Sequence, residues 1–261
     1  MATQTANLGA IGHTMFHASA ELCNRNAGFH NSVYRGKNLG TSVSAAQYAQ
    51  ISAGTFDDMF IGDYWVINGV TWRIACFDYW LNTGDTACTT HHVVIVPDSN
   101  LASSAMNATN ITDGGYIGSD FKTGENSNTG LATAKSAINS AFGSAHILSH
   151  RELFTNSVSG GIANSWAWYD STVDLMNETM VYGHEACSGK LTNSFNYNVG
   201  IDKGQLPLFK HDHSRITNRA YWWVRSVVSS AYFALVGSNG LAFDDTASLA
   251  YGVRPAFAIC A

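Results

Sequence analysis

Two histidine groups are the residues whose spacing could bind a metal. His211 and His213 flank Asp212, and on a β-strand this H-x-H spacing would direct both imidazoles to the same side of the sheet. No third ligand can be identified by its spacing, and a polar loop is the favoured alternative. The adjacent pair His91-His92 would point to opposite faces of a strand and cannot form a site alone. His211 and His213 are therefore the only metal candidates, and no metal is predicted.

Motifs for other chemistry are missing from the sequence. There is no G-x-S-x-G elbow, no G-x-G-x-x-G after a strand and no P-loop, so neither a serine nucleophile nor a nucleotide cofactor has an anchor. Asp244-Asp245 supplies the two carboxylates that a glycosidase needs, but adjacent side chains on a turn usually diverge. A solvated turn or a ligand at the rim of a calcium site is commoner, although the D-x-D-x-D loop that would support calcium is absent. We therefore expect a protein that is not an enzyme and has no cofactor.

Composition narrows the class further. Hydrophobic residues make up 46% of the 261 residues, and 7 Trp, 11 Tyr and 13 Phe indicate a packed core rather than disorder. Only 13% of residues are charged, and the net charge is −5, which gives no electrostatic basis for binding nucleic acid. No stretch is apolar for long enough to cross a membrane, so membrane insertion is not expected. Low charge with many small polar and aromatic residues is typical of extracellular particles and adhesins.

The five cysteines are odd in number, widely spaced and without a C-x-x-C motif, so they read as buried reduced thiols of a protein made in a cytoplasm. The N-terminus has no basic region before an apolar stretch, so no secretory signal is expected. A protein that acts outside the cell would then be released by lysis.

Local patterns predict the elements of the first half of the chain. Residues 1–40, rich in Gly and Asn, are expected to form an extended docking arm. Ser42 or Ser44 should cap a helix over 45–51 that Gly54 ends. Apolar residues on either side of Asn68-Gly69 predict a β-hairpin with a type I′ turn, and the run at 93–96 predicts a buried strand.

The second half alternates between loops, helices and strands. Residues 99–130 are expected to form a long surface loop, which in a compact domain is usually functional. Helices are predicted at three places and strands at three more: helices at 131–142, 149–154 and 173–180, and strands at 221–224, 232–236 and 256–259. No internal repeat is visible. The fold class is therefore α+β, with short antiparallel strands, two or three helices and long loops.

Adjacent tryptophans stand out near the C-terminus. Neighbouring side chains of a strand point to opposite faces, so of Trp222 and Trp223 one ring should face the core and the other solvent or a subunit contact. A rigid exposed ring among small polar residues is a typical ligand anchor. The alternative is that loops cover both rings.

Two motifs around these residues resemble a known family. The segments are Tyr221-Trp222-Trp223-Val224-Arg225-Ser226 and Gly252-Val253-Arg254-Pro255-Ala256-Phe257. Their order and distance resemble the C-terminal domain of phage and prophage proteins of gut bacteria, which has a C-type-lectin-like fold. The same fold occurs in the variable proteins of diversity-generating retroelements and in the formylglycine-generating enzyme. The match covers roughly residues 145–261, with a weaker likeness over the hairpin region.

The resemblance implies a frame and a variable binding face. The frame residues are Trp222, Arg225, Gly252, Arg254 and Pro255; each arginine, in apolar surroundings, should pair with a carboxylate or with carbonyl groups. The predicted ligand-binding residues are Asn218, Tyr221, Trp223, Ser229, Ser230, Tyr232, Ser238, Asn239, Asp244 and Asp245. The paired cysteines of the enzyme branch have no counterpart, so its activity is not expected.

These expectations combine into one hypothesis. The chain is expected to be a phage virion protein of a tail or head fibre, with a docking arm over 1–40 that contacts other virion proteins. A lectin-like domain over 41–261, comprising a hairpin part (41–144) and a motif part (145–261), would bind a bacterial surface glycan or protein. By analogy with other fibres we expect a homo-oligomer, a trimer. The alternative is a structural capsid-decoration or baseplate subunit without a ligand.

Overall fold

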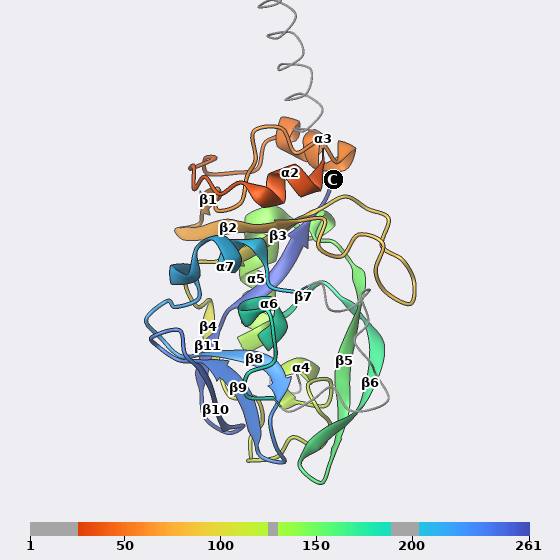
Figure 1. Cartoon of the computed structure of the whole chain (residues 1–261), viewed down its shortest axis with the longest axis vertical. Coiled ribbons are helices and arrows are strands. Elements are labelled where there is room, and N and C mark those ends of the chain that lie inside the picture. Colours follow the sequence, from red (N-terminus) through yellow and green to blue (C-terminus); the bar gives the residue numbers. More distant parts are fainter. Residues whose placement is uncertain (1–25, 125–129, 189–203) are drawn as a thin grey trace, which may run out of the picture.

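The computed structural model describes residues 26–124, 130–188 and 204–261 (Figure 1). Strands outnumber helices in this part of the chain, and nearly all strand pairs are antiparallel. The helices are short: α2 (Ala27–Ser32), α3 (Ala45–Ala53), α4 (Asp120–Thr123), α5 (Gly130–Phe142), α6 (Glu178–Tyr182) and α7 (Pro207–His211), with the 3₁₀ turns η1 (Ser144–His146) and η2 (His213–Arg215). The predicted α+β class is confirmed, although the helices are more numerous than the two or three expected.

The first sheet has five antiparallel strands in the order β1-β2-β3-β12-β7. These are β1 (Tyr64–Ile67), β2 (Val70–Phe77), β3 (Val93–Pro97), β7 (Val173–Leu175) and β12 (Pro255–Ile259). The last strand of the chain, β12, lies between β3 and β7, where all of its residues are buried (Figure 1). The hairpin part and the motif part of the sequence therefore share one sheet.

The second sheet also has five strands, in the order β10-β9-β8-β11-β4. These are β4 (Ala102–Ser104), β8 (Trp222–Val227), β9 (Tyr232–Val236), β10 (Ala242–Thr246) and β11 (Tyr251–Val253). Strand β11 runs parallel to β8 and antiparallel to β4. Strand β10 is an edge strand, paired on one side only within the described sheet. One residue, Arg254, separates β11 from β12, so the chain passes from one sheet to the other there.

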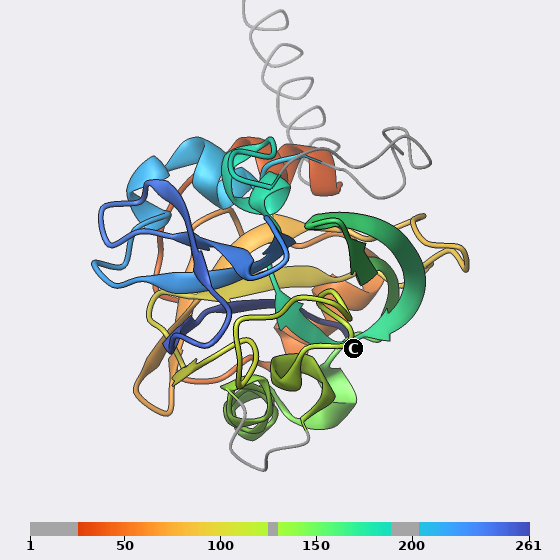
Figure 2. The same cartoon turned by 90° about the horizontal axis from the view of Figure 1, so that it is seen from below.

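A separate hairpin joins β5 (His150–Ser159) to β6 (Ile162–Ser171) and follows one side of the molecule as a curved ribbon (Figure 2). Its register shifts near Ser157, which is where bulges bend a hairpin. The helix expected at 149–154 is wrong. Leu153 and Phe154 are buried and pair across the hairpin with Trp168 and Ala167, and this pairing outweighs the local helical spacing.

Elements set by local chemistry match their predictions. Ser44 and Gln47 form a reciprocal capping box at the start of α3, and Gly54 ends the helix. Asn68 and Gly69 both have positive φ, 52° and 77°, as the type I′ turn between β1 and β2 requires. The helix expected at 173–180 is only partly present, because 173–175 is strand β7 and α6 begins after Asn177.

Residues 26–40 do not form the expected extended arm. They contain α2, and Tyr34 then forms a parallel bridge with Ile61 beside the first sheet. The imidazole of His30 is buried, and its Nδ1 lies 2.6 Å from the carbonyl oxygen of Met59. This stretch therefore packs as part of the domain, with His30 of α2 buried against it. Residues 1–25 of the predicted arm lie outside the described residues.

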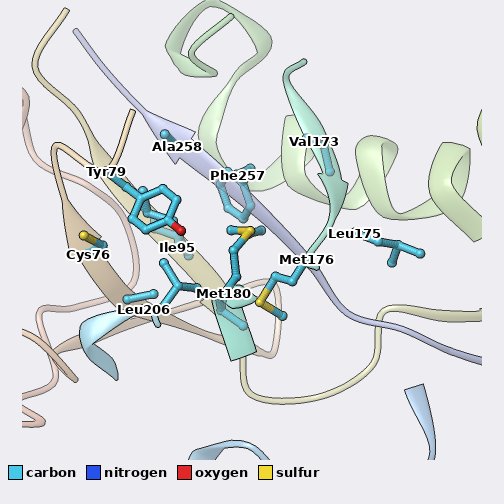
Figure 3. Packing of buried hydrophobic residues seen from close by; sticks show 14 of the residues in the cluster. Cys76, Tyr79, Ile95, Val173, Leu175, Met176, Met180, Leu206, Phe257 and Ala258 are labelled. Carbon is cyan, nitrogen blue, oxygen red and sulfur yellow. The ribbon is translucent and has the colours of Figure 1, made fainter. Parts of the chain in front are cut away.

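The core lies between the first sheet and the segments that cross it. Ile95 of β3 and Phe257 of β12 lie near Met176, Met180 and Leu206, so α6 and the start of α7 close this side (Figure 3). Four described cysteines are free thiols, three of them buried: Cys76, Cys88 and Cys260, with Cys187 half-buried. Over the described ranges, no helix combines the length and apolar character of a membrane span.

Candidate functional site

The candidate site is the outer side of the second sheet, and Arg254 fixes the frame beneath it. Its guanidinium donates to the carbonyl oxygens of Pro97 at 2.8 Å, Arg215 at 2.9 Å and Ile216 at 3.1 Å. It also lies over the ring of Trp222, 5.1 Å from the ring centroid. Burial lowers the pKa of Arg254 to about 10, which leaves it charged at neutral pH. The predicted pairing with carbonyl groups is confirmed.

Arg225 joins three parts of the fold. From β8 its guanidinium bonds Glu152 of β5 at 2.5 Å and donates to the carbonyl oxygen of Leu175 of β7 at 2.7 Å. It also lies 4.8 Å from the ring centroid of Phe154. Burial would raise the pKa of Glu152, but the charge of Arg225, with His150 beside it, lowers it to about 2. The predicted carboxylate partner of Arg225 is therefore confirmed, and the pair ties the hairpin to both sheets.

Both tryptophans of the first motif are buried, so the expectation that one ring faces outward is wrong and the alternative, that both rings are covered, holds. Trp222 packs under Arg254, and its indole N–H donates to the carbonyl oxygen of Ile216. Trp223 lies on the opposite side of β8, where Tyr251 packs against its ring and Ser104 of β4 accepts its N–H at 2.9 Å. Because the sheet is covered on both sides at β8, Trp223 cannot be a ligand contact without local opening.

Exposed aromatic and apolar side chains lie on the same sheet as the buried Trp223. The ring of Tyr221, 44% exposed, lies 5.5 Å from that of Tyr251, and the Tyr251 hydroxyl donates to Asp245 at 2.6 Å. This hydrogen bond, together with burial, raises the pKa of Tyr251 to about 12. Phe243 of edge strand β10, and Leu241 just before the strand, alternate with Asp245 and so share its side. They are 46% and 61% exposed. We call Tyr221, Leu241, Phe243, Asp245 and Tyr251 the β10 face.

The predicted ligand residues fall into two groups at opposite ends of β9. Strand β8 is antiparallel to β9, so its start lies beside the β9–β10 turn, and the hydroxyl of Thr217 donates to the carbonyl oxygen of Ser238. One end of β9 thus collects Asn218, Tyr221, Ser238 and Asn239, and the other collects Ser229, Ser230 and Tyr232. Asp244 and Asp245 lie on β10 between the two ends. The predicted residues therefore do not converge on one point.

Exposure also differs among these residues. Four are exposed (Tyr221, Ser230, Tyr232 and Asn239), five are half-buried (Asn218, Ser229, Ser238, Asp244 and Asp245) and Trp223 is buried. The side chain of Asn218 donates to Asn100 at 2.7 Å. The sequence reasoning missed Leu241, Phe243 and Tyr251. Alternation in Leu241-Ala242-Phe243 was the available signal, but it does not show that β10 is an edge strand.

His211 and His213 do not lie on a strand, whereas an H-x-H metal site would need both histidines on one strand. His211 ends α7, with Nε2 3.0 Å from the carbonyl oxygen of Asn31, and His213 begins the 3₁₀ turn η2. Among the residues that the structure describes, no cluster of three or more His, Cys, Asp or Glu side chains could hold a metal ion. Asp245 is engaged with Tyr251 and with the backbone N–H of Thr246.

A hollow lies at the base of the β5–β6 hairpin. It has a volume of about 360 Å³ and is lined by residues 86–88, residues 149–151 and Asp170. His150 is buried there; its ring stacks on Trp80 at 3.9 Å and its Nε2 lies 3.5 Å from Glu152. None of the predicted ligand residues lines this hollow.

No family model, curated protein or solved structure matches this chain.

Proposed function

We propose that this chain is a phage or prophage virion protein that attaches to a ligand on the bacterial surface through the β10 face. The assignment to a virion, and to the C-type-lectin-like fold, is supported by the resemblance of the two C-terminal motifs. The frame residues of those motifs are buried and densely bonded, whereas the residues between them include exposed rings. That contrast is the observation that carries the proposal.

The β10 face has the chemistry of an attachment surface. Aromatic rings at Tyr221 and Phe243 offer rigid contact area, which loses little entropy on binding. The Asp245 carboxylate, held by Tyr251, adds an oriented acceptor for a hydroxyl or amide group. Such groups bind glycans and proteins alike. Weak contacts would suffice on a particle that carries many copies, because multiple copies raise avidity.

Direct binding tests the proposal. The full chain, labelled, is applied to fixed cells of gut bacteria and to an array of their capsular polysaccharides, lipopolysaccharides and wall teichoic acids. Tyr221→Ala and Phe243→Ala should each reduce binding at least about tenfold, since central aromatic anchors cost more than 1.4 kcal/mol when truncated. Ile162→Ala is the matched control, because Ile162 is 53% exposed on β6 and lies outside the β10 face.

The result against the proposal is equally clear. If the wild-type chain binds cells or array, and the two β10-face variants bind as the control does, the ligand site lies elsewhere.

Sequencing the gene across a producing population is a second test, and it does not require the ligand to be known. Variation confined to adenines in codons 218–251, with Trp222, Arg225 and residues 252–257 constant, would support a diversified face. An invariant 3′ end would remove that part of the proposal.

The structural alternative has one specific observation in its favour. Leu241, Phe243 and Leu249 are each more than 40% exposed in the single chain, and exposed apolar side chains can be covered by a neighbouring subunit. A Phe243→Asp variant separates the two functions. Loss of an oligomer seen by light scattering, without any wild-type binding to cells or array, would favour a decoration or baseplate subunit.

A further inference from the structure

Lys122 of α4 and Asp174 of β7 form a buried pair that neither the frame nor the β10 face uses. The Lys122 Nζ lies 2.5 Å from Asp174 Oδ1, and the two side chains are 14% and 2% exposed. Two hydroxyl groups bond the same carboxyl group: Tyr116 donates to Oδ1 at 2.8 Å, and Ser171 donates to Oδ2 at 2.6 Å. Both carboxyl oxygens are therefore fixed, and the amine is positioned against the carboxyl group.

Aromatic rings surround the amine. The Lys122 Nζ lies 5.1 Å from the ring centroid of Phe154 and 5.7 Å from that of Tyr116, which is fully buried. With these rings around the amine, the pair is largely removed from water: 14% of the Lys122 side chain and 2% of the Asp174 side chain are exposed. Burial of two opposite charges is costly even when they are paired, so conversion to an uncharged product is favoured at this position.

A second lysine adds to the effect. Burial lowers the pKa of Lys135 on α5; Asp174 opposes this shift and Lys122 adds to it. The Lys135 ammonium therefore adds positive charge near the Lys122–Asp174 pair, and the neutral form of an amine is the one that acts as a nucleophile.

We propose that Lys122 and Asp174 condense into an intramolecular isopeptide bond. A proton passes from the Lys122 ammonium to the Asp174 carboxylate, and the neutral amine then attacks Cγ to form the N–C bond. Oδ2, held by Ser171, carries the charge of the tetrahedral intermediate and becomes the amide oxygen. Oδ1, held by Tyr116, receives the second proton from nitrogen, and its bond to Cγ breaks to release water. The ion pair becomes one amide plus one water, and no other reactant is needed.

Positioning can lower the barrier to this step. Reactants held in contact behave as if their concentration were very high, which removes much of the entropic barrier to a bimolecular condensation. The product would join α4 covalently to the edge of the first sheet and enclose the β5–β6 hairpin in the loop. This cross-link would resist mechanical unfolding, and it does not depend on the proposed attachment function.

Mass spectrometry of the folded full chain tests the bond. The expected mass is lower than the sequence mass by one water molecule. Trypsin should then fail to cut after Lys122 and should release one branched peptide that contains residues 74–135 and 152–190. Lys122→Arg keeps a positive charge near Asp174 but should yield separate linear peptides, whereas Lys135→Arg should keep the cross-link. Asp174→Asn should lose ammonia instead of water and reach the same linked product as the wild type.

A wild-type chain whose mass equals the sequence mass, and which trypsin cuts after Lys122, overturns the proposal. This result would leave the pair as a buried salt bridge. The decisive mass and tryptic map are measured on the wild-type protein, so a variant that fails to fold does not affect the result.

Discussion

Removal of Arg225 should destabilise the domain strongly while leaving the β10 face untouched. Arg225→Met keeps most of the side-chain volume but leaves the Glu152 carboxylate buried without its cation, and the Leu175 carbonyl oxygen without this donor. Breaking one partner of a buried ion pair costs about 3–5 kcal/mol in the free energy of unfolding. We expect a loss of that size, measured by guanidinium denaturation with tryptophan fluorescence at neutral pH.

A double-mutant cycle separates the ion pair from packing. Glu152→Gln alone removes the charge, but a neutral amide can still accept a hydrogen bond from Arg225. The Arg225→Met/Glu152→Gln double variant should be more stable than Arg225→Met alone, because no uncompensated carboxylate remains. A coupling free energy of about 2 kcal/mol or more is expected for two groups in one buried network.

The same pair predicts a pH dependence. The pKa of Glu152 is lowered from 4.5 to about 2 by Arg225 against the effect of burial, so the pair contributes stability that is fully present above about pH 4.5. That contribution, on the order of 3 kcal/mol by linkage, is lost as the pH falls towards 2. Glu152→Gln should lack this part of the acid transition. Additive single effects in the cycle, or the same acid slope with and without Glu152, would refute the reasoning.

Three smaller predictions concern two glycines and one tyrosine hydroxyl group. Gly252→Ala should destabilise the protein by about 1–3 kcal/mol, because the new Cβ would lie 1.9 Å from the Asn100 amide nitrogen; Asn100→Ala in the same chain should restore part of the loss in a denaturant series. Gly69→Ala should cost roughly 1 kcal/mol in thermal unfolding, since φ there is +77° although the space is open. Asp245→Asn should lower the pKa of Tyr251 from about 12 towards 10, followed by NMR of labelled tyrosine; an unchanged pKa would contradict the Tyr251–Asp245 hydrogen bond.

Elements that depend on a few neighbouring residues were predictable from the sequence. Asn68-Gly69 specifies its turn because both residues tolerate positive φ, and Ser44 with Gln47 satisfies the free N–H groups at a helix start. The kind of partner that each motif arginine finds was also predictable, since a guanidinium group in an apolar sequence must pair with carboxylate or carbonyl groups. Which partners they find depends on the topology.

Features set by distant segments were not predictable. Residues 149–154 have a spacing that suits a helix, but their partner strand, ten residues long, begins eight residues later and makes them a strand. The burial of Trp223 depends on Ser104, more than a hundred residues earlier in the chain. No alternation pattern near Trp223 contains that information, so the ring was expected to be available for binding.

The candidate site shows the same limit. Composition singled out a polar and aromatic stretch and treated it as one surface. The pairing of β8, β9 and β10 places Tyr221 and Tyr232 at opposite ends of β9. Edge position is a property of the whole sheet, so the exposure of Phe243 followed only from the strand order.

The arrangement of the two motifs explains how such a face could change in sequence without loss of the fold. Every residue from 252 to 260 is buried, and Arg254 sits at the single step from β11 to β12, bonded to three backbone carbonyl groups. Backbone acceptors do not change with sequence, so this anchor tolerates substitution around it. The exposed side chains at Tyr221, Tyr232 and Phe243 bury less area, and their replacement should cost little stability. If the β10 face binds as proposed, stability and recognition depend on different residues of the same short segment, which is what a diversified binding face requires.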